Sequence, residues 1–96
     1  MGVLTSTRRV TSALVDTANA LPSSSVIHTR SLDPAHIQAV VVNAGNANAE
    51  TGAQGISDAA TMGATVAEEL EIDPGQVAVC STGVIGRLFE MDRVVA

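Results

Sequence analysis

Ser81, Thr82 and Gly83 form the short polar stretch of this sequence that is best suited to chemistry. They follow residues 77–80, a run of small and β-branched residues that is typical of a strand covered on both faces. In α/β folds, chemistry usually takes place at the carboxyl ends of such strands. The Thr82 hydroxyl and the Gly83 backbone N–H could together donate to a negative charge that develops during a reaction. The competing interpretation is a tight turn between strands, because Ser, Thr and Gly are ordinary turn residues.

Cys80 offers a second kind of chemistry, that of a thiol nucleophile with His28 or His36 as its base. Nothing in the spacing pairs the cysteine with either histidine. A cysteine at the end of an apolar strand is usually a small buried hydrophobic residue, and we expect Cys80 to be one. The two histidines have no cysteine or carboxylate pattern around them, so no metal site is predicted.

The loop over 43–52, of sequence NAGNANAETG, could bind an anion through free backbone N–H groups because it opens a predicted helix. It matches neither GxGxxG nor GxxxxGK[ST], so it gives little support for a nucleotide, and no cofactor is predicted. A purely structural turn explains the same residues, since Asn and Gly tolerate left-handed backbone.

The elements that position these residues form a βαβ unit in the second half of the chain. Strands are predicted over 37–43 and 77–80, and a helix over 53–71. Small and apolar residues recur along one face of that helix, and Gly63 among them predicts very close packing on a sheet. The order strand, helix, strand favours parallel pairing, so the predicted fold class is α/β with packed helices.

The remaining segments predict shorter elements. An edge strand is predicted over 3–10, with Arg8 and Arg9 outward. The segment over 12–21 is ambiguous but matches helical spacing, with Ser12 as its N-cap, and a loop over 22–25 follows it. The later predictions are a short strand over 26–30, a turn or helix start at Asp33-Pro34, a break at Asp73-Pro74-Gly75, and a helix start over 91–96.

Length and composition limit what the chain can do. Its 96 residues allow one small domain, and Phe89 is its one aromatic residue, so the core is built from small side chains. We therefore expect a partial domain that completes its core against other protein, in an oligomer. The net charge of −5 and the absence of lysine argue against binding to nucleic acid.

The compartment is predicted from similar considerations. A single cysteine cannot form an internal disulfide, which fits a reducing environment. No segment approaches the roughly 20 apolar residues that span a membrane, and the first residues lack the apolar region of a secretory signal. A cytoplasmic protein without a membrane partner is the expectation.

Three segments together resemble the ornithine acetyltransferase family, the bifunctional glutamate N-acetyltransferases of arginine biosynthesis. They are VVVNAGNANAETG over 40–52, ISDA over 56–59 and VCSTGVIGRLFEMD over 79–92. Their order and spacing match as well as their residues, and VLTSTRRV over 3–10 also resembles a family segment. The stretch over 13–25 fits poorly and reads as an insertion or a divergence.

The resemblance implies an acyl transfer from N-acetylornithine to glutamate. Family members are longer chains that cut themselves before a threonine, which becomes the amino-terminal nucleophile of a β chain. The Thr-Gly of the family's STG motif forms the oxyanion hole, and here these residues are Thr82 and Gly83. The resemblance implies further that residues 1–96 are part of an α chain, with no nucleophile of their own, and that the partners are the rest of the α chain and the β chain.

The alternative function is a truncated, non-catalytic relative that acts as an anion-binding or assembly module, for example through the loop over 43–52. A fragment with no function of its own is a third interpretation. As part of the larger α/β enzyme, the chain would need no metal and no nucleotide.

Overall fold

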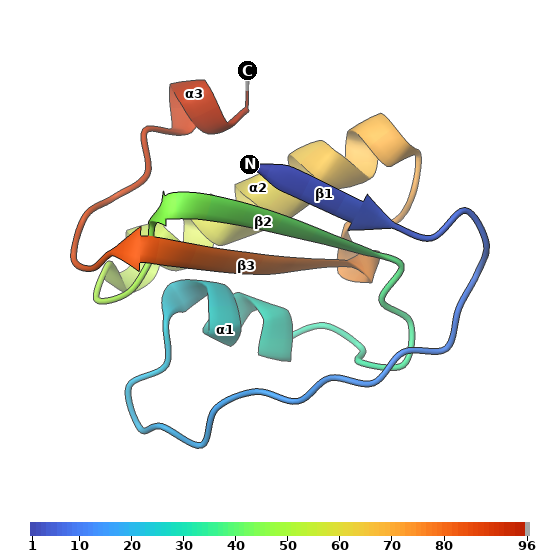
Figure 1. Cartoon of the computed structure of the whole chain (residues 1–96), viewed down its shortest axis with the longest axis horizontal. Coiled ribbons are helices and arrows are strands. Elements are labelled where there is room, and N and C mark those ends of the chain that lie inside the picture. The colour runs from blue at the N-terminus through green and yellow to red at the C-terminus, as the bar shows by residue number, and fades with distance from the viewer. Residues whose placement is uncertain (96) are drawn as a thin grey trace.

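The sheet consists of β1 (Gly2–Thr5), β2 (Ala39–Asn46) and β3 (Val77–Val84), in that spatial order, within residues 1–95. These are the residues that the structure, a computed structural model, describes. β1 is antiparallel to β2, whereas β3 is parallel to β2, so the predicted parallel βαβ unit is confirmed. The carboxyl ends of β2 and β3 therefore meet at one end of the sheet, on the left in Figure 1.

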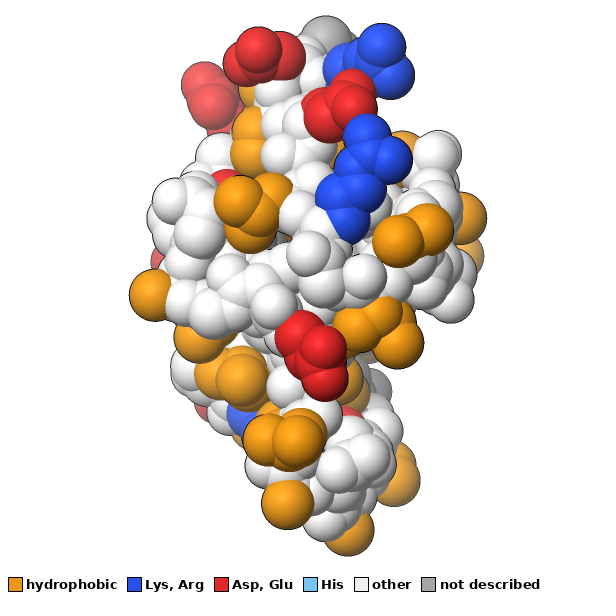
Figure 2. All heavy atoms as spheres, turned by 90° about the vertical axis from the view of Figure 1, so that its left-hand side faces the viewer, with side chains coloured by type: hydrophobic (Ala, Val, Ile, Leu, Met, Phe, Trp, Pro, Cys, Tyr) orange, Lys and Arg blue, Asp and Glu red, His pale blue; other side chains and the backbone are white. Residues whose placement is uncertain are grey.

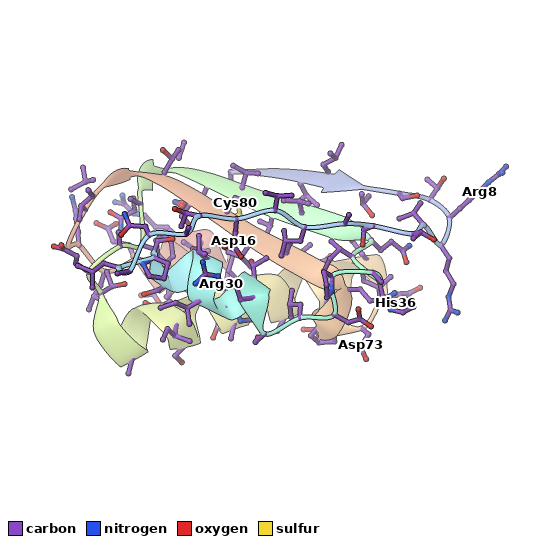
Figure 3. The ribbon with its side chains drawn as sticks, turned by 90° about the horizontal axis from the view of Figure 1, so that it is seen from below. Arg8, Asp16, Arg30, His36, Asp73 and Cys80 are labelled. Atoms are coloured by element: carbon purple, nitrogen blue, oxygen red, sulfur yellow. The ribbon has the colours of Figure 1, made fainter. Side chains whose placement is uncertain are left out.

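The helices are α1 (Ser24–Arg30), α2 (Gly52–Leu70) and the short α3 (Met91–Val94), with a 3₁₀ turn, η1 (Pro74–Gln76), before β3. Figure 3 shows α1 and α2 together on one side of the sheet. The core lies between that side and α2, where Val41, Val77 and Val79 pack with Met62 and Phe89. The predicted α/β class with packed helices is confirmed.

Gly63 brings α2 very close to its neighbours, as its position on the predicted helix face suggested. A Cβ atom at this residue would lie 3.4 Å from Cγ2 of Val79 and 3.6 Å from Nε2 of His28. The helix thus approaches both β3 and α1 at this point. Its observed bounds differ from the predicted 53–71 by a single residue at each end.

The predicted strand over 26–30 is wrong, because these residues belong to α1. Ser23 is the N-cap, and its hydroxyl accepts a hydrogen bond of 3.3 Å from the N–H of Val26. The serines that indicated a loop are therefore the cap and first turn of a helix. Helical spacing then places Ser25 and Thr29 on one buried face.

The segment over 12–21 is irregular, so its helical interpretation is wrong. Ser12 caps no helix: its hydroxyl donates to the carbonyl of Pro34 at 2.6 Å and accepts from the N–H of Ile37 at 2.8 Å. The segment is largely exposed, so it lacks the burial that stabilises a short helix in a protein. It is held to α1 by the ion pair between Asp16 and Arg30, which point toward each other in Figure 3.

Two element boundaries also move. The first strand ends at Thr5, because the Ser6 hydroxyl accepts from the N–H of Arg8 at 3.2 Å and turns the chain; Arg8 is exposed, as expected. At the other terminus, α3 begins at Met91 as predicted, and Ala96 lies outside the described residues. Within residues 1–95, none of the helices combines the length and the apolar character that crossing a membrane would require.

Candidate functional site

Thr82 and Gly83 lie inside the last half of β3, not in a loop after it. The predicted strand ends at Cys80, whereas the observed one continues to Val84 because Ser81–Val84 pair with Asn43–Asn46 of β2. Both Thr82 and Gly83 are exposed. The prediction that they stand at the carboxyl end of a strand of the βαβ unit holds, but the alternative of a tight turn after Cys80 does not.

Side chains alternate between the two faces of the sheet, and this separates Thr82 from its neighbour Ser81. Val79 and Ser81 face the helices, as shown by the packing of Val79 in the core and by the hydrogen bond from Ser81 to α1. Thr82 therefore projects from the opposite, open face. It could reach a reacting group on that face of the sheet.

The outer edge of β3 explains where the Gly83 N–H points. Val79 lies two residues before Ser81. The Thr29 hydroxyl accepts a hydrogen bond from the N–H of Val79 and donates one to its carbonyl, each at 3.1 Å. Val79 thus turns its backbone polar groups away from β2. Backbone groups alternate between the two edges of a strand, so the N–H of Gly83, four residues later, is directed to the same outer edge. The Thr82 hydroxyl and the Gly83 N–H are then neighbouring donors at an exposed strand end.

Glycine is required at position 83 by the backbone of β2. Gly83 has a φ of 126° and Gly45, its partner across the ladder, a φ of 113°, both in the region that favours glycine. A Cβ atom on Gly83 would lie 2.4 Å from the carbonyl carbon of Gly45. The backbone of β2 therefore occupies the space that a side chain at position 83 would need.

Cys80 is exposed, which contradicts the expectation of a buried residue. The reason is the alternation of the strand: Cys80 lies between Val79 and Ser81, both facing the helices, and so points to the open face. Figure 3 shows its sulfur on the side of β3 away from α1. Sequence reasoning judged the strand to be covered on both faces, and beyond Ala78 it is not.

Neither histidine is placed to act as a base for Cys80. His28 lies on the helix side of the sheet, where burial lowers the pKa of its imidazole below the usual 6.5. His36 contacts Asp33, with Nδ1 2.6 Å from Oδ2. The pKa of that Asp33 carboxyl is lowered by a hydrogen bond from the Ala35 N–H and by His36. Within residues 1–95, no group of three His, Cys, Asp or Glu side chains gathers as a metal site would require.

The loop between β2 and α2 turns its polar groups inward. Asn48 is fully buried; its amide donates to the carbonyl of Gly55 at 2.9 Å and its side-chain oxygen accepts from the Thr51 hydroxyl at 2.8 Å. The N–H of Ala47 donates to the carbonyl of Val84 at 2.8 Å. These contacts favour the interpretation of the loop as a structural turn over that of an anion site.

A hollow of mixed polar and apolar lining lies beside the Gly45–Gly83 contact. It has a volume of about 260 Å³ and is lined by Asn43–Asn46 and by residues from the segment before and within α3. Glu90 there bridges two arginines, at 2.9 Å from Arg87 and 3.0 Å from Arg93. Figure 2 faces this end of the molecule and shows arginine and acidic side chains side by side near its top. The hollow is open and of a size to admit part of a small molecule.

Sequence reasoning missed three residues that support the site: Ser25, Thr29 and Asn48. Each bonds to β3 or to a residue that does. The available signal was the run SSSVIHT, in which a serine cap precedes two hydroxyl residues four positions apart on one helix face. Reading that run as loop and strand concealed it. Asn48 had no comparable signal, because its partners lie in other elements.

Comparison with known proteins matches all 96 residues, 1–96, to the sequence model of the ArgJ family. The chain is 42% identical over 96 residues to the arginine biosynthesis bifunctional protein ArgJ of Bacillus licheniformis, covering 98% of this chain and 24% of that protein. It is 44% identical over 88 residues to a glutamate N-acetyltransferase of Methanothermobacter thermautotrophicus, covering 91% of this chain and 22% of the relative. The chain thus spans less than a quarter of either relative's length.

Two solved structures share the fold. The ArgJ protein of Bacillus halodurans superimposes with a TM-score of 0.90 at 38% identity, over 97% of this chain and 50% of that one. The ornithine acetyltransferase of Mycobacterium tuberculosis, solved in complex with ornithine, gives a TM-score of 0.85 at 36% identity, over 90% of this chain and 48% of that one.

Proposed function

This chain belongs to the ArgJ family, and from that premise we propose that it supplies the oxyanion hole of an acetyltransferase in arginine biosynthesis. The enzyme would transfer acetyl from N-acetylornithine to glutamate. The observation that carries the proposal is the placement of Thr82 and Gly83 as adjacent exposed donors at the carboxyl end of β3.

In this proposal the reaction has two acyl-transfer steps. A threonine of a β chain, outside residues 1–96, attacks the acetyl carbonyl and forms a tetrahedral intermediate with a negatively charged oxygen. The Thr82 hydroxyl and the Gly83 N–H donate to that oxygen. The intermediate collapses to an acetyl-threonine as the C–N bond breaks, and the proton lost by the threonine hydroxyl leaves with the amine of ornithine. The amino group of glutamate then attacks the ester through a second such intermediate, which releases N-acetylglutamate and returns a proton to the threonine oxygen.

The geometry supports this division of roles. Both donors belong to one strand, and that strand is fixed on its inner edge by β2 and at Val79 by Thr29. A preformed pair of donors stabilises charge in the transition state without having to reorganise. The α and β chains would arise by autocatalytic cleavage and act together as a cytoplasmic hetero-oligomer, with this chain as one segment of the α chain.

The alternative, a non-catalytic module that binds anions through the loop over 43–52, has less support. The side chain of Asn48 and the N–H of Ala47 in that loop are already bonded within the chain. Groups that are satisfied internally are not free to bind a ligand.

A chimera tests the proposal, in which these 96 residues replace the matching segment of the Bacillus licheniformis relative. We expect it to transfer acetyl from N-acetylornithine to glutamate, and the 96-residue chain alone to transfer none, because the nucleophile would be missing. Turnover by the 96 residues alone would contradict the assignment. So would a chimera that unfolds cooperatively and yet neither acetylates its threonine nor forms N-acetylglutamate.

A further inference from the structure

A buried chain of hydrogen bonds leads from the interior of the protein to the residue next to Thr82. It begins at Asn48, whose side-chain amide donates to the Ser25 hydroxyl at 3.3 Å. The Ser25 hydroxyl in turn lies 2.9 Å from that of Ser81. Asn48 and Ser25 are 0% and 1% exposed, so water does not compete for the bond between them, and the bond to the half-buried Ser81 is partly shielded.

Asn48 is itself held in a single orientation. Its amide nitrogen also donates to the Gly55 carbonyl in α2, and its side-chain oxygen accepts from Thr51. Its backbone carbonyl accepts from the N–H of Ser24 at 2.9 Å, which joins it to the start of α1. Its φ of 50° is a left-handed value that asparagine tolerates. Both the nitrogen and the oxygen of the Asn48 amide are therefore held by other hydrogen bonds besides the one to Ser25.

The same loop also forms hydrogen bonds with the end of β3 and the residues that follow it, beyond the two donors. On one side of Asn48, the N–H of Ala47 donates to the Val84 carbonyl; on the other, the Ala49 carbonyl accepts from the N–H of Gly86, each at 2.8 Å. Thr82 and Gly83 thus lie between a hydrogen bond at Ser81 and hydrogen bonds at Val84 and Gly86. The backbone of this short stretch is constrained on both sides.

The face that Ser81 occupies decides the face that Thr82 occupies. Successive side chains in a strand point to opposite sides, so a hydrogen bond that holds Ser81 toward the helices holds Thr82 toward the open face. Catalytic donors act only when they are placed to within a fraction of an ångström. Without the hydrogen bond to Ser25, the Ser81 side chain loses its connection to α1, and the pairing with β2 alone would hold the backbone at Thr82 and Gly83 less precisely.

We propose that Asn48, Ser25 and Ser81 are positioning residues that hold the Thr82 hydroxyl and the Gly83 N–H in their working orientation. This inference rests on the proposed function, because it needs Thr82 and Gly83 to be the oxyanion donors. None of the three residues touches substrate; they act through β3. The hydroxyl of Ser81, which the family resemblance leaves without a direct role, receives one here as the last member of this chain.

The experiment is steady-state kinetics of acetyl transfer by the chimera with Ser25→Ala and, separately, with Ser81→Ala. We expect each variant to lower kcat by about 10-fold, with KM changed little, because a misplaced donor weakens transition-state binding more than substrate binding. The double variant should lose no more than either single one, since both remove the same hydrogen bond. Ser31→Ala is the control: Ser31 ends the same helix, and its hydroxyl donates to the His28 carbonyl at 2.6 Å and to none of these three residues.

A second comparison separates this inference from the proposed function. Each variant is also made together with Thr82→Val. If Ser25 acts through the donors, its substitution should lower kcat clearly less once the Thr82 hydroxyl is gone. An unchanged kcat in a folded Ser25→Ala enzyme, or an equal loss with and without the Thr82 hydroxyl, would overturn the positioning role while leaving the oxyanion hole intact. An unchanged kcat in Thr82→Val alone would instead remove the oxyanion hole, and with it the basis of this inference.

Discussion

Gly45 and Gly83 face each other across β2 and β3, so closely that a Cβ atom on Gly83 would lie 2.6 Å from the Gly45 carbonyl oxygen. Gly45 ends the segment NAG over 43–45, and Gly83 ends the segment STG over 81–83. Both segments belong to the stretches that resemble the family. The contact joins those segments into one structure. It also places the proposed oxyanion donor on a backbone that has no room to move toward β2.

Gly83→Ala should therefore be the more damaging of two matched alanine substitutions. Both Gly83 and Gly45 have positive φ, a strain that costs about 1–3 kcal/mol for a residue with a side chain. Only at Gly83 does the new methyl group also overlap backbone, since a Cβ at Gly45 has nothing within 4 Å. We expect a larger drop in Tm of the chimera for Gly83→Ala than for Gly45→Ala. Equal drops would show that the two strands separate at little cost.

Thr82→Val tests the side-chain donor itself. The change keeps the shape of the residue and removes its hydroxyl, so kcat of the chimera should fall by about 10²–10³-fold, the usual loss for one oxyanion donor. KM should change less, because the hydrogen bond strengthens as charge develops. Thr82→Ser keeps the hydroxyl and is the control. If Thr82 only satisfies local backbone, Tm would fall modestly and kcat would stay nearly the same.

Thr29→Val tests the attachment of α1 to the edge of β3. The buried Thr29 hydroxyl is the partner of both the N–H and the carbonyl of Val79, and without it these two groups lose their hydrogen bonds. An unsatisfied buried polar group costs about 1–3 kcal/mol. We expect denaturant unfolding to show that Thr29→Val lowers the free energy of unfolding of the chimera by at least that amount. Thr29→Ser should lower it less. A loss no larger for valine than for serine would mean that water replaces the hydroxyl.

His28 should make stability depend on pH. Burial lowers the pKa of its imidazole below 6.5, and its Nε2 is buried among residues 1–95 without a hydrogen-bond partner. As the pH falls, the His28 imidazole therefore becomes protonated in the unfolded chain at a higher pH than in the folded chain. The contribution of the neutral imidazole to stability is complete above about pH 6.5 and is lost as the pH falls from there through the folded-state pKa.

The free energy of unfolding of the chimera, measured between about pH 8 and pH 5, should decline less steeply in His28→Gln than in the unchanged protein. The control is His36→Gln, since that imidazole is largely exposed beside Asp33. Identical slopes for His28→Gln and the unchanged protein would show that the folded chain accommodates the charged ring.

The sequence by itself determined the βαβ unit and the position of the two proposed donors in it. The helical period around Gly63 and the apolar runs on either side of that helix depend on local residue order, so pattern alone predicted α2 and both parallel strands. The place of Thr82 and Gly83 directly after an apolar run is visible in the same way, and the family resemblance adds the expectation that they form an oxyanion hole. Ser23, the cap of α1, is also visible in the sequence, but a run of serines after a proline predicts a loop equally well.

Only the tertiary structure decided which groups meet. Ser25, Asn48 and Ser81 are far apart in the chain, and their hydrogen bonds exist because α1 packs against the outer edge of β3. Cys80 is exposed because the sheet is open on one face there, which a run of small apolar residues cannot reveal. The physical reason is common to both cases: residue patterns report local conformation, whereas burial and hydrogen bonding depend on what the rest of the chain brings alongside.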